Sequence, residues 1–504
     1  MNKRIMNIVN FVRGIDPDKR VDLCFEAVKQ IEINKKYGIP NTFLLQYDAM
    51  LRDDIRNLFL KEKDENMELG VWFENCKDLI ENIGLKWRGR VGWDWDWHVN
   101  AGFLMGYTLK EREMIVDEVF RYFKEIFGEY PKVAGSWIMD SYSMNYICEK
   151  YGVKAFCNCR EQFGVDAYTL WGGYSSGGYY PAKKNMLCPA QTVEEQMDAP
   201  VFRMLGADPL YNYDEFKYCH YDTKGKGCAW TMEPGWPFGQ SPEIMDWYFD
   251  TYYRQPCLAF SEATTGQENS FGWPVFGEGY IMQIEKLVKL QEEGVVVLEK
   301  LGDTGENFKK AYKTSPPQAQ VAVDDWFGNG IKTVWYNCKN YRANLFFRNG
   351  KLFFRDLNKY DERYEERYLK EPCEAWCAVY DALPLIDGRF WSTENGEECG
   401  IFMDREVEDI YVKEENETDL RIDVKFKDGT SGSILCGENA ITFENIVAEY
   451  SIGQPTDTTL KLDDNKVIAE HNNFVYDITI AGDIQKTENG WKILPIDGVG
   501  KICF

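Results

Sequence analysis

The sequence predicts an α/β protein in which a distorted (β/α)7 barrel is followed by a C-terminal antiparallel β-sandwich region. Two observations support this fold class. Through the first three hundred residues, short apolar runs alternate with amphipathic helical segments, as expected for parallel strands joined by right-handed crossovers. Beyond about residue 315 the pattern changes to short alternating strands separated by turn residues, which is typical of antiparallel sheets.

The elements follow from these patterns. The predicted barrel strands lie at residues 6–12, 42–46, 68–73, 133–139, 153–157, 202–205 and 257–260. Helices are predicted at residues 19–37, 53–61 and 110–127, with a closing helix at residues 279–299. A Thr-Ser-Pro-Pro run at residues 314–317 marks a boundary, so we expect a catalytic barrel domain at 1–314 and a β-rich domain at 315–504. Strands of the second domain are predicted at residues 333–336, 344–347, 351–355, 420–426, 433–435 and 474–480.

Composition excludes several classes of partner. The chain has 58 basic and 82 acidic residues and a net charge of −24, which argues against nucleic acid or an anionic membrane as partner. We find no secretory leader and no apolar run long enough to cross a membrane. Fifteen scattered cysteines favour reduced thiols over a disulfide framework, so a cytoplasmic location is expected. The oligomeric state is not indicated.

Aromatic residues make up 15% of the chain, with 16 Trp, 30 Tyr and 30 Phe. Most of them must fill the core, but aromatic faces also stack on the C–H faces of sugars. A carbohydrate is therefore the partner that the composition favours.

Histidines are too few for the common hydrolase schemes. The chain has only His98, His220 and His471, and none of these is spaced as His-x-x-x-His. Zinc hydrolases use three protein ligands, commonly histidines, and catalytic serines need a histidine base. No metal and no cofactor is therefore predicted. Carboxylates among aromatic residues remain, and these are the groups that cleave glycosidic bonds.

Asp140 directly follows the predicted strand at residues 133–139 and precedes a helix that ends at Tyr151-Gly152. Two interpretations are equally open. A carboxylate at the carboxyl end of a barrel strand lies where α/β barrels keep their catalytic groups. Alternatively, Asp140 is the N-cap of the following helix.

Further carboxylates and aromatic residues follow other predicted strands. Glu74 follows the third strand and Glu268 lies in a polar segment after the seventh, between amide side chains that could orient it. Arg160 and Glu233 are additional candidates, each of which could equally be structural. Two segments combine acids with aromatic residues: Trp93-Asp94-Trp95-Asp96-Trp97-His98 and Asp208-Pro209-Leu210-Tyr211-Asn212-Tyr213-Asp214.

Several motifs resemble known carbohydrate-active barrels. The segment from residue 106 to the strand that precedes Asp140 resembles the NodB-type polysaccharide deacetylases. Gly135-Ser-Trp-Ile-Met-Asp140 resembles the nucleophile motif of glycoside hydrolase family 57, and Phe271-Gly272-Trp273 resembles the strand-seven motif that carries that family's acid/base. A closer likeness, over about residues 5–310, is to a bacterial family described as glycoside hydrolases; it rests on residues 158–160, 168–173, 202–209 and 266–273.

The chain also departs from these patterns. The deacetylase motif has an Asp pair at strand one and a His-x-x-x-His, where this chain has Asn10-Phe11-Val12-Arg13 and a lone His98. Family 57 has Glu where this chain has Asp140, and that shorter side chain would leave room for a water, which favours inversion.

These observations lead to the hypothesis of a glycoside hydrolase that uses a pair of carboxylates in an aromatic-lined barrel mouth. Asp140 is the predicted nucleophile or base and Glu268 the predicted general acid, with Glu262 as the rival acid. The predicted substrate-binding residues are Glu74, Trp93, Trp95, Asp96, His98, Trp137, Arg160, Asp208, Asp214 and Trp273. Two alternatives stay open: a metal-dependent deacetylase or lyase that uses Asp94, Asp96 and His98, and a non-catalytic glycan-binding barrel.

Overall fold

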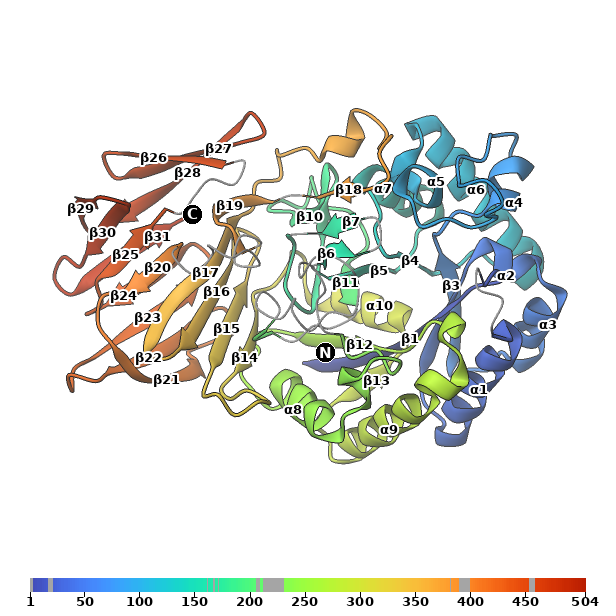
Figure 1. Cartoon of the computed structure of the whole chain (residues 1–504), viewed down its shortest axis with the longest axis horizontal. Coiled ribbons are helices and arrows are strands. Elements are labelled where there is room, and N and C mark those ends of the chain that lie inside the picture. Colours follow the sequence, from blue (N-terminus) through green and yellow to red (C-terminus); the bar gives the residue numbers. More distant parts are fainter. Residues whose placement is uncertain are drawn as a thin grey trace.

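The computed structural model describes residues 3–16, 21–160, 162–165, 168–170, 172–204, 209–211, 231–380, 382–388, 399–452 and 458–504. Two parts lie side by side along the longest axis of the molecule (Figure 1). An α/β barrel, coloured from blue to yellow-green, forms one end, and antiparallel sheets, coloured from yellow to red, form the other. The predicted fold class is confirmed.

The barrel sheet runs in the order β12-β1-β2-β3-β4-β5-β11, with parallel neighbours. Strands β11 and β12 approach each other without a hydrogen-bonded ladder in the described residues, so the barrel is nearly closed. The antiparallel edge strand β8 makes the sheet mixed. The bounds are β1 Arg4–Val12, β2 Asn41–Leu45, β3 Met67–Trp72, β4 Val133–Ser136, β5 Ala155–Cys159, β8 Gly178–Tyr179, β11 Val201–Met204, β12 Ser261–Thr265 and β13 Val297–Glu299.

Helices cover the outside of the barrel (Figure 1). Their bounds are α1 Leu23–Tyr37, α2 Tyr47–Leu51, α3 Asp53–Glu62, α4 Lys77–Asn82, α5 Val99–Gly102, α6 Leu109–Phe127, α7 Ser141–Tyr151, α8 Pro242–Tyr253, α9 Trp273–Glu292 and α10 Leu301–Ala311. Sequence signals explain the ends of the longer ones. Helix α6, for example, begins with a reciprocal capping box between Thr108 and Glu111 and ends at Gly128 in the left-handed conformation.

Successive side chains of β1 point alternately to the inside and to the outside of the barrel. Met6 and Ile8 pack with residues of α8 and α9 in the outer layer. Val9 and Phe11 belong instead to the main core, where the Phe11 ring lies 4.3 Å from that of Trp72. The next residue with the same orientation is Arg13, just beyond the end of the strand, and the alternation therefore directs it toward the barrel mouth.

Two antiparallel sheets pack face to face in the C-terminal part and share one core. The first sheet contains β14 Gln318–Ala322, β15 Lys332–Asn337, β16 Tyr341–Arg348, β17 Lys351–Lys359, β19 Leu383–Ile386, β20 Gly400–Met403, β25 Ala448–Ser451, β29 Asp483–Thr487 and β30 Gly490–Leu494. The second contains β21 Val407–Glu414, β22 Leu420–Phe426, β23 Ser431–Gly437, β24 Ala440–Glu444, β26 Thr458–Asp463, β27 Lys466–His471, β28 Phe474–Ala481 and β31 Val499–Cys503. This arrangement confirms the predicted β-sandwich.

A segment of the C-terminal part reaches back over the barrel (Figure 1, orange). Tyr368 and Tyr380 belong to the barrel core, and the Glu366 carboxylate accepts the backbone N–H groups of Ser141 and Met186 at 2.8 and 3.0 Å. The small sheets here and nearby contain β6 Gln162–Val165, β7 Tyr168–Leu170, β9 Pro181–Ala182, β10 Asn185–Pro189 and β18 Ala378–Val379. The domain boundary near residues 314–317 stays a prediction.

The seventh predicted strand is misplaced by about four residues. The apolar run at 257–260 is not a strand: Leu258 has a positive φ of 61° and packs in the core of the C-terminal sandwich. The barrel strand is β12, so Glu262 lies within it. The predicted closing helix at 279–299 is in fact α9 followed by β13. No helix in the described residues is long and apolar enough to span a membrane.

Gly266, directly after β12, allows the seventh strand to lie against the first. Its φ is +137°, and a Cβ there would lie 1.8 Å from the carbonyl oxygen of Val9. Only glycine permits this approach.

We expect Gly266→Ala to lower the free energy of unfolding by more than about 3 kcal/mol, because backbone strain adds to a clash with β1. Gly84→Ala is the matched control, since Gly84 also has a positive φ (+79°) but nothing lies within 4 Å of its Cβ position. The control should cost only about 1–2 kcal/mol. Urea unfolding measures both; equal losses would show that the contact with Val9 is unimportant.

Candidate active site

Arg13 joins two carboxylates at the mouth of the barrel. Its Nη2 lies 3.1 and 3.0 Å from the two carboxylate oxygens of Glu74, and its Nε lies 3.2 Å from Oε1 of Glu268. All three residues are at most 8% exposed. Because both carboxylates contact one planar guanidinium, the tips of β1, β3 and β12 bring them together as neighbours.

Backbone contacts hold these strand tips in register. The Asn269 side chain accepts the backbone N–H of Arg13 at 2.8 Å and donates to its carbonyl at 3.0 Å. Phe11 and Glu268 form an isolated parallel bridge. The chain on either side of Arg13 and Glu268 is thus tied together, so the contact between them does not depend on long flexible side chains.

Polar and aromatic side chains surround Glu74. Gln46 and Trp95 each donate to its Oε2 at 2.9 Å. The indole of Trp95 also covers Arg13, whose guanidinium carbon lies 4.2 Å from the ring centroid. Trp137 lies nearby against Phe11, with ring centroids 5.4 Å apart. Glu74 and Trp95, which were both predicted to bind substrate, are thus in direct contact, and that role stays a prediction.

Other polar side chains contact Glu268 and the residue that precedes it. The Ser270 hydroxyl donates to Oε1, the oxygen that faces Arg13. The neighbouring Gln267 donates to Oε1 of Glu233 at 3.1 Å, and the Trp236 indole donates to Oε2 of Glu233 at 3.0 Å. A third buried carboxylate, Glu233, is thus hydrogen-bonded to the residue that precedes Glu268 in the sequence.

Asp140 is a structural residue in this fold. It is fully buried and caps α7, where its carboxylate accepts the Ser143 backbone N–H at 3.0 Å and the Ser143 hydroxyl at 2.8 Å. Arg112, on α6, donates to it at 2.8 Å. No described contact joins Asp140 to Glu268 or Glu262. The N-cap interpretation is confirmed. The described partners of the Asp140 carboxylate are Ser143 and Arg112 and do not include Glu268, because β4 ends at Ser136 and Asp140 lies four residues beyond the strand.

Glu262 lies deeper in the barrel than the mouth. It lies six positions before Glu268, on the order of 20 Å in an extended chain. Its Oε1 accepts from Thr264 at 2.9 Å, while its Oε2 has no hydrogen-bond partner in the described part of the chain. Burial raises the pKa of this carboxyl to about 8, against the opposing effects of Thr264 and the charge of Arg160.

Most of the described contacts of residues 93–98 lie within that loop. Burial would raise the pKa of Asp96, but hydrogen bonds from Arg90 and from the His98 backbone outweigh it and lower that pKa. Arg90 also lies over the rings of Trp93 and Trp97, at 3.7 and 3.9 Å. These contacts organise the loop itself, so Trp93 and Asp96 lie outside the Arg13 cluster.

The remaining predicted binding residues are placed elsewhere. Trp273 begins α9 and packs against Phe276 and Tyr280 in the outer layer, with ring centroids 5.3 and 6.3 Å away, so its described ring contacts do not lie in the Arg13 cluster. Arg160 is buried and donates to the Tyr252 hydroxyl at 2.9 Å. Asp208 and Asp214 lie outside the described residues.

A deacetylase-type metal does not fit the residues present. The Arg13 guanidinium fills the space between Glu74 and Glu268, and the described residues contain no group of three His, Cys, Asp or Glu side chains that could hold a metal ion. Asp94, of the alternative metal set, is exposed and faces Lys77 at 3.5 Å. His98 stacks on Trp376, with ring planes 10° apart.

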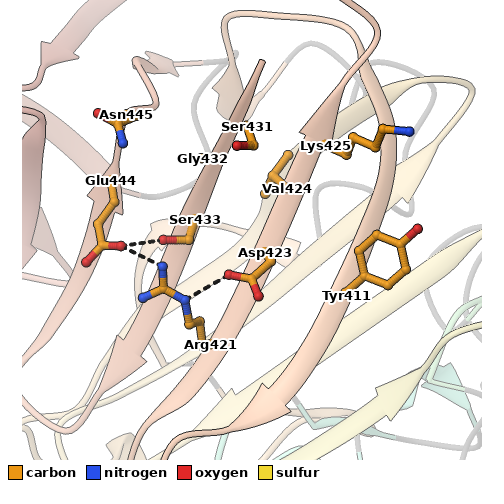
Figure 2. A pocket seen from close by; sticks show the side chains of 10 residues that line it. All are labelled: Tyr411, Arg421, Asp423, Val424, Lys425, Ser431, Gly432, Ser433, Glu444 and Asn445. Atoms are coloured by element: carbon orange, nitrogen blue, oxygen red, sulfur yellow. Dashed lines mark hydrogen bonds and ion pairs between the residues drawn. The ribbon is translucent and has the colours of Figure 1, made fainter. Parts of the chain in front are cut away.

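A hollow of ≈ 330 Å³ lies on the outer face of β21–β24 (Figure 2). Arg421 donates to Asp423 and Glu444 at 2.8 Å each, and Ser433 donates to Glu444 at 2.6 Å. Tyr411, at its edge, is 59% exposed. These charges are paired on a solvated strand face, as is ordinary for a protein surface.

A scan against known protein families matches no family model, and a search of curated proteins finds no sequence match. Solved structures do match. A protein provisionally described as a glycoside hydrolase/deacetylase, from Parabacteroides distasonis, has 13% identity and a TM-score of 0.49, with 75% of this chain and 89% of that chain covered.

Two proteins provisionally described as polysaccharide deacetylases also match, each at 12% identity over 62% of this chain. The one from Mycobacterium smegmatis has 92% of its length covered and a TM-score of 0.36. The one from Pseudomonas aeruginosa has 93% of its length covered and a TM-score of 0.38. The barrel type that the sequence resembles is thus found again among these matches, which are likenesses of fold.

Arg13 and Gln46 are site residues that were not predicted from the sequence, where Arg13 is only a departure from the deacetylase motif. A signal was available: both are the first polar residues after an apolar barrel strand, the position where catalytic groups gather.

Asp140→Ala should lower the free energy of unfolding by about 3–5 kcal/mol, because it removes the cap of α7 and leaves the buried Arg112 without its carboxylate. Asp140→Asn keeps a capping oxygen and should cost less. Asp53→Asn, at a side chain that is 83% exposed, is the control and should change stability by under about 0.5 kcal/mol. If Asp140→Ala matched that control in urea unfolding, the structural role would be wrong.

Glu262 should make the protein less stable as the pH rises. Between the ordinary carboxyl pKa of 4.5 and about 8, Glu262 stays protonated in the folded state and ionises on unfolding. The free energy of unfolding then falls by about 1.4 kcal/mol per pH unit from this group alone. Glu262→Gln should remove that slope, measured by urea unfolding from pH 5.5 to 7.5, whereas the exposed Glu125→Gln should keep it. Parallel profiles for the wild type and Glu262→Gln would contradict the assignment.

Proposed function

We propose that this chain is a carbohydrate-modifying hydrolase that cleaves glycosidic bonds with Glu74 and Glu268. One observation supports the proposal above all: two buried carboxylates, which follow β3 and β12 on either side of β1 in the strand order, share the Arg13 guanidinium at the carboxyl ends of these strands. Glycosidases use two neighbouring carboxyl groups, one as acid and one as nucleophile or base.

The contacts of Glu74 assign one of the two roles to it, and Glu268 takes the other. Glu74 accepts from Arg13, Gln46 and Trp95, and every one of these contacts requires its oxygens as acceptors. Glu74 is therefore assigned the carboxylate role, as nucleophile or as base toward water. Glu268 is assigned the acid that protonates the leaving oxygen, as the sequence predicted.

Arg13 and the tryptophans complete this assignment. A guanidinium beside the carboxylate pair offsets the repulsion between two buried negative charges. Trp95, which donates to Glu74, and Trp137, which packs against Phe11, place aromatic rings at this end of the barrel, and such rings can stack on the C–H faces of a sugar. For the metal-dependent alternative, the described residues contain no set of metal ligands. The non-catalytic alternative differs from this proposal because it predicts no turnover of any substrate.

Glu74→Gln and Glu268→Gln should each lower kcat/KM about 10²–10⁴-fold on whichever aryl glycoside of a broad panel the wild-type chain hydrolyses. The change is nearly isosteric, so circular dichroism and thermal unfolding should show that both variants are folded. Glu125→Gln, a surface carboxyl that is 61% exposed, is the matched control and should keep full activity.

Three results would overturn the proposal. Near-normal turnover in both variants would remove the two glutamates from the reaction. Loss of activity with a chelator, together with release of acetate from acetylated sugars, would favour the metal-dependent deacetylase. Binding of glycans with no turnover of any substrate would favour the non-catalytic barrel.

A further inference from the structure

A continuous path of aromatic rings leads from the barrel mouth to the surface. Trp95, which donates to Glu74, lies 6.0 Å from Trp97 between ring centroids. Trp97 lies 6.0 Å from His98, and His98 lies 5.0 Å from Trp376. The path ends on a residue of the C-terminal part of the chain.

Trp376 is unusual in its exposure. It is 69% exposed, whereas the other tryptophans whose side chains are described are buried or half-buried. His98 covers one face in a parallel stack, with ring planes 10° apart. The exposed ring offers a rigid apolar surface of the kind that can stack on the C–H face of a sugar.

The backbone around Trp376 holds the ring in place. Its carbonyl accepts the Val99 N–H at 2.8 Å, and the Cys373 N–H donates to the Met105 carbonyl at 2.7 Å. The Cys373 thiol donates to the Cys377 carbonyl at 3.5 Å, which closes the short loop. The platform therefore needs little ordering on binding, which favours affinity.

We propose that Trp376, stacked on His98, is a distal subsite for a sugar unit of a carbohydrate chain whose reacting bond lies at Glu74 and Glu268. Three ring-to-ring steps separate Trp376 from Trp95, so one sugar ring stacked at the mouth does not reach it. The substrate class is therefore an oligosaccharide or polysaccharide. This inference rests on the proposed function, and it gives the C-terminal part a role in the site.

The net charge of the chain indicates which kind of oligosaccharide or polysaccharide it binds. The net charge of −24 repels polyanions at long range, and an aromatic platform needs no charge on the sugar. The expected occupant is a neutral glycan chain.

Affinity gel electrophoresis in soluble galactomannan, barley β-glucan, arabinoxylan or amylopectin tests this inference, with polygalacturonate as the acidic comparison. A Glu268→Gln background prevents consumption of the glycan. At least one neutral polymer should retard the full chain, and Trp376→Ala should weaken that retardation about tenfold in apparent affinity. Tyr411→Ala, at a ring of similar exposure on the distant β-sheet face, should leave it unchanged.

Several results of this electrophoresis experiment would contradict the inference. Equal retardation of Trp376→Ala and its parent, loss of retardation in Tyr411→Ala instead, or retardation by none of the neutral polymers would each overturn the distal subsite. Stronger retardation by polygalacturonate would overturn the choice of a neutral glycan. Failure of the proposed function appears separately, as activity that survives Glu268→Gln in solution assays.

Discussion

The Arg13 guanidinium between Glu74 and Glu268 is the interaction on which the account of this site depends. Two carboxylates buried side by side repel each other and lose their hydration, so one cation between them offsets both costs. The fold supplies this cation from the strand that lies between the other two in the barrel order, since β1 is next to β12 and two strands from β3. Gly266 and Asn269 then fix how closely these tips approach.

The same interaction bears on the metal-dependent alternative that the sequence analysis left open. The sequence resembles barrels of the polysaccharide deacetylase type, yet the described carboxylates at the mouth are neutralised by a side chain. A buried guanidinium remains protonated at any working pH and presents its donors in a fixed plane. It orients the acids but offers no open coordination position for an acetyl oxygen. This arrangement supports the proposed carboxylate chemistry.

Much of the fold could be predicted because periodicity is a local property. Helices α3 and α6 begin and end within one residue of the predicted bounds, and the change of pattern beyond residue 315 predicted the sandwich. Glu74, Trp95 and Glu268 were predicted singly as site residues. Their association through Arg13 was not, because it depends on which strand tips face one another. Asp140 and Glu262 were misplaced for a related reason: shifts of three or four residues at the ends of β4 and β12 turn a strand-tip acid into a helix cap or an interior group.

The most direct test of the central claim is a crystal structure of the full chain soaked in zinc, with anomalous data collected at the zinc edge. The account predicts Arg13 within hydrogen-bonding distance of both Glu74 and Glu268, and no anomalous peak at the barrel mouth. A zinc peak between these two glutamates, with Arg13 displaced, would contradict it.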